Sequence, residues 1–166
     1  MNDCWPVSAI DITTNSPSET MEFGRSLGTK LRGGEVIAIC GPLGSGKTHL
    51  IKGIAAGAGA EDLTHVNSPT FVIINEYSGR LDICHIDAYR LNSISEFEML
   101  GFDDYCHGRS VVLIEWADKI ESALQGIDYV RIVLDHAGET IRKIHVENTP
   151  EYMQEGQPHP DIRQSG

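Results

Sequence analysis

The sequence predicts an α/β fold with three layers, in which helices cover a central sheet of parallel and antiparallel strands. Short apolar runs at 36–40 and 110–116 are typical of strands buried on both faces, as in a parallel sheet. The first run leads through three glycines into a helical pattern at 48–57, which is the strand, loop and helix order of α/β folds. Residues 128–135 and 140–147 alternate apolar and polar side chains and predict an antiparallel pair.

The N-terminal elements are predicted by a strand pattern and a helix cap. Residues 7–13 are expected to form an edge strand. Ser16 and Glu19 have the spacing of a capping box, and Pro17 occupies the first helical position, so a helix should begin here. The pair Gly33-Gly34 should mark its end.

The middle of the chain predicts a hairpin and then a helix. Residues 70–87 have the pattern of two strands joined by a turn at Ser78-Gly79. Residues 93–106 are expected to be helical, with Ser93 or Ser95 as the cap. A further short helix is expected at 117–124.

The whole chain of 166 residues has the length and composition of one globular domain. We expect this domain to span residues 1–149. From Pro150 to residue 166 the chain is polar and rich in Gln, Pro and Gly, so we expect a disordered C-terminal tail.

Composition and charge exclude several classes of protein. There is no basic segment followed by a long apolar stretch at the N-terminus, and no apolar run could span a bilayer, so we expect a cytoplasmic protein without membrane contact. The net charge of -11 argues against broad binding of DNA or RNA. The four cysteines lack zinc-ligand spacing and predict no disulfide framework; they are Cys4, Cys40, Cys84 and Cys106.

A glycine-rich loop separates the strand at 36–40 from the following helix. Gly41, Gly46, Lys47 and Thr48 match the P-loop spacing G-x4-G-K-[ST]. Glycines let successive backbone amides surround an anion, and the helix adds its free N–H groups, so we expect a P-loop NTPase-like fold that binds ATP with Mg²⁺. The residues expected to contact the nucleotide here are Gly41, Pro42, Leu43, Gly44, Ser45, Gly46, Lys47, Thr48 and His49.

Two carboxylates follow predicted strands and could complete the site. Asp87 ends one strand and Glu115 ends another, and ligands in α/β sheets collect at the carboxyl ends of strands. Spacing alone does not separate their roles: one could bind Mg²⁺ while the other positions or deprotonates the attacking water. Either could also be a solvated strand end. His85 is expected to be a hydrogen-bonded strand histidine, since no second ligand lies at metal-binding spacing.

An ordered set of motifs resembles one protein family. The motifs are GPLGSGKTHL (41–50), SPTF (68–71), HIDAYRL (85–91), EFEMLGFDDY (96–105) and LIEW (113–116). Together they resemble TsaE, formerly YjeE, a family of bacterial P-loop ATPases needed to make threonylcarbamoyladenosine in tRNA. The resemblance covers roughly residues 16–147.

The resemblance implies specific roles for individual residues. Thr48 and Glu115 would coordinate Mg²⁺, and Lys47 would hold the phosphates. Asp87 would be required for turnover, which makes Lys47, Asp87 and Glu115 the expected catalytic set. The segment Ser68, Pro69 and Thr70 would be a switch near the γ-phosphate, with Thr70 contacting the nucleotide. Tyr89, Arg90 and Trp116 match the functional surface, and Arg142 matches an arginine beside the nucleotide.

The family also implies partners. TsaD-like and TsaB-like proteins would receive the action of the ATPase, and tRNA, modified at adenosine 37, would be reached only through that complex. Alone, the chain should hydrolyse ATP slowly and be stimulated by the complex. The family commonly has an aspartate at the position of Pro42 and a threonine at that of His49. Neither position supplies the lysine, the metal-binding hydroxyl or an essential glycine, so we expect nucleotide binding to be modified but retained.

Two other functions are compatible with the same P-loop. A small-molecule kinase would need an acceptor pocket and an arginine-rich lid. A non-hydrolysing module would use ATP only to shift a docking face.

Overall fold

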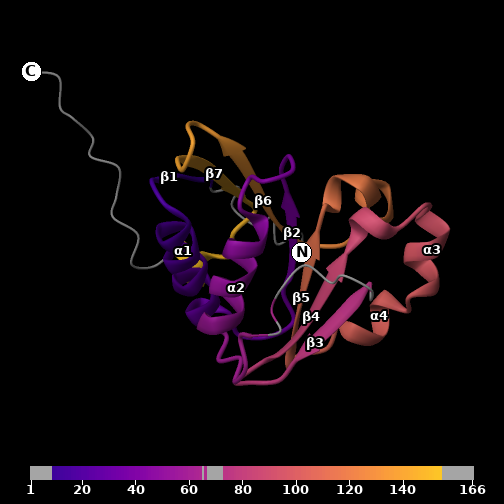
Figure 1. Ribbon diagram of the computed structural model, residues 1–166. Coiled ribbons are helices and arrows are strands. Elements are labelled where there is room, and N and C mark those ends of the chain that lie inside the picture. Colours follow the sequence, from indigo (N-terminus) through magenta and orange to yellow (C-terminus); the bar gives the residue numbers. More distant parts are fainter. Residues whose placement is uncertain (1–8, 65, 67–72, 155–166) are drawn as a thin grey trace, which may run out of the picture.

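The computed structural model describes residues 9–64, 66 and 73–154 (Figure 1). Seven strands form one sheet in the order β1-β7-β6-β2-β5-β4-β3. The bounds of the strands are β1 Ile10–Thr14, β2 Val36–Cys40, β3 Ile74–Tyr77, β4 Asp82–Asp87, β5 Ser110–Glu115, β6 Val130–His136 and β7 Arg142–Glu147.

Parallel pairing occupies the centre of the sheet and antiparallel pairing its two sides. β2 pairs in parallel with both β5 and β6, and β4 pairs in parallel with β5. The pairs β1/β7, β6/β7 and β3/β4 are antiparallel. The predicted mixed sheet is therefore confirmed, with β1 as the predicted edge strand.

Helices cover both faces of the sheet, which gives the predicted three layers (Figure 1). The helices α1 (Pro17–Lys30) and α2 (Lys47–Gly57) pack together on one face. The helices α3 (Ile94–Met99) and α4 (Phe102–Tyr105) lie on the other face. Two 3₁₀ helices, η1 (Ala88–Arg90) and η2 (Ala117–Leu124), belong to this second layer.

The cap of α1 matches the predicted capping box with one difference. The Glu19 amide donates to Ser16 Oγ at 3.1 Å, as expected. The Glu19 carboxylate, however, accepts from the amide of Asn15, one residue before the cap, at 2.7 Å. The chain leaves α1 at Leu31, before the predicted Gly33-Gly34 stop.

The predicted helix over 93–106 is two short helices. Ser93 is the cap, and its Oγ accepts from the Glu96 amide at 3.2 Å. Gly101 then adopts a left-handed conformation with φ 70°, which ends α3 and starts α4 in a new direction. The predicted short helix at 117–124 is the 3₁₀ helix η2, in which Ile120 interrupts the helical geometry.

The chain after Pro150 is not wholly a tail. Residues Glu151–Gln154 form the short helix α5. Met153 is 0% exposed within the core, and the Tyr152 hydroxyl donates to Glu35 Oε1 at 2.8 Å. The prediction of a disordered tail from 150 is therefore wrong for these residues, because one apolar side chain and one hydroxyl anchor them. Residues 155–166 lie outside the described residues.

Two further expectations concern cysteines and membranes. Cys40 and Cys84 are buried free thiols. Within the described ranges, no helix combines the length and apolar character needed to cross a bilayer.

Candidate nucleotide-binding site

The strand order brings the predicted site residues to one edge of the sheet. β2 ends at Cys40 and continues into the glycine-rich loop, and α2 begins at Lys47. In the neighbouring strand β5, Glu115 pairs with Ile39 of β2 and also with Asp87 of β4. Both carboxylates therefore lie at the edge of the sheet where the loop begins, Glu115 on the strand next to β2 and Asp87 one strand further away.

The loop has the backbone of an anion cradle. Gly41 and Gly46 have φ values of 152° and 97°, which non-glycine residues rarely adopt. A Cβ atom on Gly41 would lie 2.5 Å from the carbonyl oxygen of Leu134, so a side chain does not fit there. Gly46 is also the N-cap of α2, and no side chain of the described chain caps that helix end. The geometry leaves the first turn of α2 suited to a phosphate ligand.

Lys47 is buried against the loop and only 4% exposed. Its Nζ donates to the carbonyl oxygens of Gly41 at 2.7 Å and Pro42 at 2.9 Å. The ring of Trp116 lies 3.7 Å from the same Nζ, a cation–π contact. Burial lowers the pKa of Lys47, and the nearby Glu115 carboxylate opposes this shift. The ammonium thus sits at the centre of the loop.

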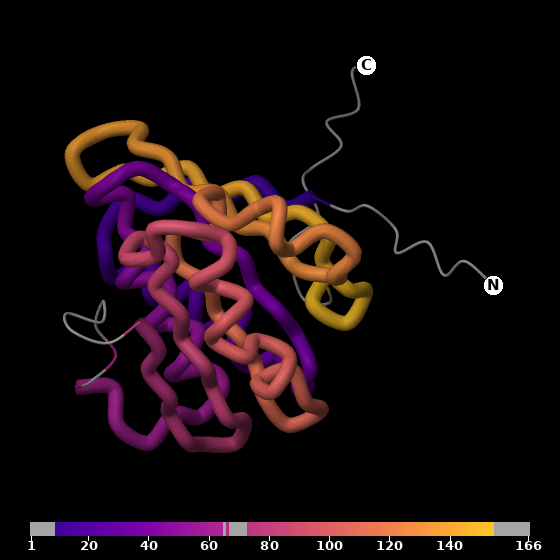
Figure 2. Tube along the Cα trace, turned by 90° about the vertical axis from the view of Figure 1, so that its right-hand side faces the viewer, coloured from indigo at the N-terminus to yellow at the C-terminus, as the bar shows by residue number. Residues whose placement is uncertain are grey.

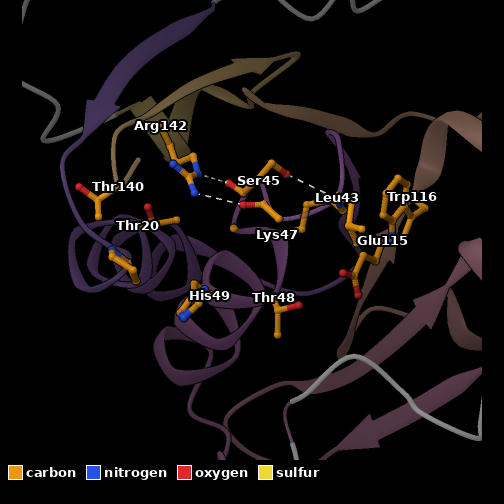
Figure 3. Close-up of a pocket in the computed structure, with 13 residues that line it drawn as sticks. Thr20, Leu43, Ser45, Lys47, Thr48, His49, Glu115, Trp116, Thr140 and Arg142 are labelled. Carbon is orange, nitrogen blue, oxygen red and sulfur yellow. Dashed lines mark hydrogen bonds between the residues drawn. The ribbon is translucent and has the colours of Figure 1, made fainter. Parts of the chain in front are cut away.

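A cavity of about 270 Å³ joins the loop to one of the carboxylates (Figure 3). It opens along the start of α2, and Figure 3 shows Glu115 and Trp116 on one side of the loop and Arg142 on the other. The residues that line it are Pro17, Thr20, Leu43, Gly44, Ser45, Gly46, Lys47, Thr48, His49, Glu115, Trp116, Thr140 and Arg142.

The two carboxylates differ in their surroundings. Glu115 is 2% exposed, lines the cavity and contacts His85 Nε2 through Oε2 at 3.1 Å. Asp87 is also buried but is absent from the cavity lining; it accepts from the Tyr89 amide at 3.1 Å. Burial raises the pKa of Asp87; the Tyr89 amide opposes this shift and the Glu115 charge adds to it. Glu115 is thus the carboxylate that the cavity reaches.

The donor set fits a magnesium ion shared with phosphates. The Thr48 hydroxyl and the Glu115 carboxylate line the same cavity and are hard oxygen ligands. Among the described residues there is no group of three or more His, Cys, Asp or Glu side chains able to hold a metal. Mg²⁺ characteristically binds through one or two protein oxygens together with substrate phosphates, so this sparse set is suitable.

Arg142 contacts the loop itself. Its Nε donates to Ser45 O and its Nη2 to Gly44 O, both at 3.1 Å (Figure 3). His136 Nε2 lies 3.3 Å from Leu43 O. Both residues belong to the β6–β7 hairpin, whose turn lies against the loop in Figure 2. Three consecutive loop carbonyls are therefore contacted from the hairpin.

The residues predicted for the functional surface are Trp116, Tyr89 and Arg90, and Tyr89 packs against Trp116. Trp116 itself has φ 60°, a strained conformation for a bulky residue. The ring centroids of Trp116 and Tyr89 are 5.0 Å apart, and Tyr89 is 59% exposed. Arg90 Nε lies 3.7 Å from Asp87 Oδ2. Trp116 and Tyr89 thus connect the cavity with the protein surface, whereas Arg90 pairs with Asp87 outside the cavity lining.

Some site residues were missed by sequence reasoning and others lie outside the described chain. Thr20, His136 and Thr140 carry no motif, and Pro17 is predicted only as the first residue of a helix. The packing of α1 and the β6–β7 hairpin beside the loop brings these four residues to the site. The predicted switch residues Ser68, Pro69 and Thr70 lie outside the described residues.

Comparison with known proteins gives consistent matches. Residues 14–144 match the family model described as "Threonylcarbamoyl adenosine biosynthesis protein TsaE". The chain is 42% identical over 132 residues to the "tRNA threonylcarbamoyladenosine biosynthesis protein TsaE" of Bacillus subtilis, which covers 79% of this chain and 80% of that one. It is 36% identical over 111 residues to the protein of the same description from Treponema pallidum, covering 67% and 81%.

A solved structure agrees with these matches. The crystal structure of Bacillus subtilis YdiB superposes with a TM-score of 0.68 and 34% sequence identity, covering 85% of this chain and 86% of that one.

Proposed function

Because the chain belongs to the TsaE family, which acts in the biosynthesis of threonylcarbamoyladenosine in tRNA, we propose that it binds and hydrolyses ATP in that process. The observation that carries the proposal is the cavity that joins Lys47 and Thr48 of the P-loop to the buried carboxylate of Glu115. This is the arrangement in which P-loop NTPases bind a nucleotide with a metal ion.

The loop amides and Lys47 would hold the phosphates. On binding, Lys47 Nζ would exchange the carbonyl oxygens of Gly41 and Pro42 for phosphate oxygens, which carry a full negative charge. The rest of the nucleotide would occupy the part of the cavity lined by Pro17, Thr20 and Thr140.

Thr48 and Glu115 would hold Mg²⁺. When bound, the ion would neutralise charge that develops on the β- and γ-phosphate oxygens. The role of Glu115 is to offer a buried carboxylate beside the loop. The hydroxyl of Thr48 offers the second oxygen from the first turn of α2.

Asp87 would position the attacking water and accept its proton. Its raised pKa brings the carboxyl group closer to the working pH, which favours general-base catalysis. Asp87 is paired in register with Glu115, so the two carboxylates are adjacent at the sheet edge. We assign metal binding to Glu115, since of the two carboxylates only Glu115 lines the cavity. We assign water activation to Asp87 because the family resemblance implies that this residue is required for turnover.

A partner would be needed for fast turnover. Arg142 donates to loop carbonyls and Arg90 pairs with Asp87, so both guanidinium groups are committed to oxygens of this chain. A partner could supply a charged group to the transition state or order the site. We propose that this partner is a complex of TsaD-like and TsaB-like proteins, and that tRNA is reached only through it.

Two measurements test the proposal. Calorimetry should detect ADP and ATP binding that Mg²⁺ strengthens and that Lys47→Ala abolishes. Lys52→Ala, on the same helix but outside the cavity lining, is the matched control and should bind normally. Phosphate release should be slow for the chain alone and should rise when the partner complex is added.

Other outcomes would redirect the assignment. Transfer of phosphate to a metabolite would indicate a small-molecule kinase. ATP-dependent binding to the partner complex with no phosphate release would indicate a non-hydrolysing module. No nucleotide binding at all would contradict the proposal.

A further inference from the structure

A chain of polar side chains lies buried beneath the site. His85 on β4 is 0% exposed. Its Nε2 lies 3.1 Å from Glu115 Oε2, and its Nδ1 lies 3.4 Å from the hydroxyl of Tyr77 on β3. Glu115 and Tyr77 are buried as well. The chain of contacts therefore runs from the edge strand of the sheet to the carboxylate that lines the cavity.

The hydrogen-bonding capacity of each group determines which atoms donate and which accept in this series of contacts. A carboxylate only accepts, so the His85 nitrogen that faces Glu115 must carry the proton. The other nitrogen of a neutral imidazole is then an acceptor, and the Tyr77 hydroxyl can donate to it. The ring thus satisfies both neighbours in a single tautomer, with Nε2–H directed at Glu115 Oε2.

A structural role alone explains these three buried polar side chains poorly. β4 and β5 lie inside the sheet, and the residues beside His85 and Glu115 on these strands are mostly apolar and buried. Burying polar groups is unfavourable unless each is hydrogen-bonded, and replacing a buried polar pair with apolar side chains of similar volume is often neutral or stabilising. A role for Glu115 at the cavity explains why a carboxylate is buried at this position. The need to hydrogen-bond that buried carboxylate then explains why residue 85 is a histidine.

We propose that His85 is a positioning residue that fixes the Glu115 carboxylate for a divalent cation. The proposal rests on the proposed binding of Mg²⁺ with a nucleotide. By holding Oε2, the imidazole restricts the rotamer of Glu115 and keeps the carboxylate at the cavity that Thr48 also lines. Outer hydrogen bonds of this kind orient metal ligands, and their loss typically weakens metal binding about 10- to 100-fold.

Two isosteric substitutions separate positioning from packing. In His85→Gln the side-chain amide nitrogen lies near the place of Nε2 and can still donate to Glu115. In His85→Asn the amide nitrogen lies near the place of Nδ1, so the bond to Glu115 is lost. His85→Phe is a second loss variant, which fills the space with an apolar ring. Cys84→Ala on the same strand is the control for destabilisation without contact to Glu115.

The measurement is the ratio of ADP affinities with and without Mg²⁺, obtained by calorimetry on each folded variant. We expect His85→Asn and His85→Phe to reduce this ratio about tenfold or more while leaving metal-free ADP affinity unchanged. His85→Gln and Cys84→Ala should keep most of the increase in ADP affinity that Mg²⁺ gives in the wild-type chain. Thermal unfolding on the same samples identifies folded variants, and either loss variant suffices for the comparison.

The outcomes distinguish this inference from the function on which it rests. If the wild-type chain binds ADP with no effect of Mg²⁺, the proposed metal site fails and the role of His85 fails with it. If the wild-type chain shows the effect and the loss variants keep it in full, the proposed function stands and the positioning role is overturned. An equal loss in Cys84→Ala would likewise overturn positioning in favour of general destabilisation.

Discussion

Replacing Arg142 should weaken nucleotide binding by disordering the P-loop. The guanidinium donates to the carbonyl oxygens of Gly44 and Ser45, and in a peptide unit the carbonyl and the next amide point in opposite directions. Holding the Ser45 carbonyl toward the hairpin therefore directs the Gly46 amide away from it. Arg142 thus stabilises the loop shape that a phosphate needs.

The size of the effect follows from the two bonds. Hydrogen bonds from a charged donor contribute about 1.5–3 kcal/mol each when buried, and these are partly exposed, so we take about 1–1.5 kcal/mol each. If the loss falls on binding, about 2–3 kcal/mol corresponds to about 30- to 150-fold weaker ADP binding in Arg142→Ala. Arg142→Lys can keep a hydrogen bond to one of the two carbonyl oxygens, so its ADP affinity should fall less.

Two assays together test this reasoning. Calorimetry measures ADP affinity, and hydrogen exchange in the nucleotide-free protein measures protection of the Ser45 amide, which donates to the carbonyl oxygen of Pro42 at 3.1 Å. Arg142→Ala should lower both. Arg131→Ala, which removes an arginine of β6 that pairs with Glu147, is the matched control and should change neither. Lost affinity with unchanged exchange in the free protein would refute the reasoning, since Arg142 would then act by touching the nucleotide.

Four more outcomes follow from other parts of the structure. Lys47→Ala should remove measurable ADP binding in calorimetry, and retained micromolar binding would contradict the assigned phosphate site. Asp87→Asn should bind Mg·ATP normally yet release phosphate about 10²- to 10⁴-fold more slowly with partners present, and normal release would exclude a general base. Met153→Ala should lower the free energy of unfolding by about 2–5 kcal/mol in urea titrations, because it leaves a cavity beneath α5. A loss under about 0.5 kcal/mol, as for a typical surface substitution, would place α5 outside the core. The hydrogen bond to Asp11 raises the pKa of His145 above 6.5. The pair therefore stabilises the fold fully below pH 6.5, and this contribution is lost as the pH rises from 6.5 through the pKa of the folded state. His145→Gln should flatten the change in melting temperature over this pH range.

Local signals predicted much of the fold. The caps at Ser16 and Ser93, the turn at Ser78-Gly79 and the alternation in β6 and β7 depend on neighbouring residues only, and each element is present. Gly101 was visible in the sequence, but a glycine within a helical pattern indicates either a tolerated residue or a break. Here its left-handed backbone makes it a break.

Long-range contacts were beyond the reach of the sequence. Met153 and Tyr152 stand in a polar segment, and their burial depends on contacts with residues more than a hundred positions away, such as Glu35. The same holds for the site: the loop spacing predicts Lys47 and Thr48, whereas the contact of Arg142 with the loop exists only because β6 lies beside β2. Spacing identifies the residues proposed to bind the ligand, and strand order decides which residues contact the loop that carries them.

The crystal structure of the chain with Mg²⁺ and a non-hydrolysable ATP analogue tests the central claim most directly. The account predicts that the β- and γ-phosphates lie on the loop amides and Lys47, and that the metal contacts the Thr48 hydroxyl and Glu115. Phosphates bound elsewhere, or a metal that touches neither of these residues, would contradict it.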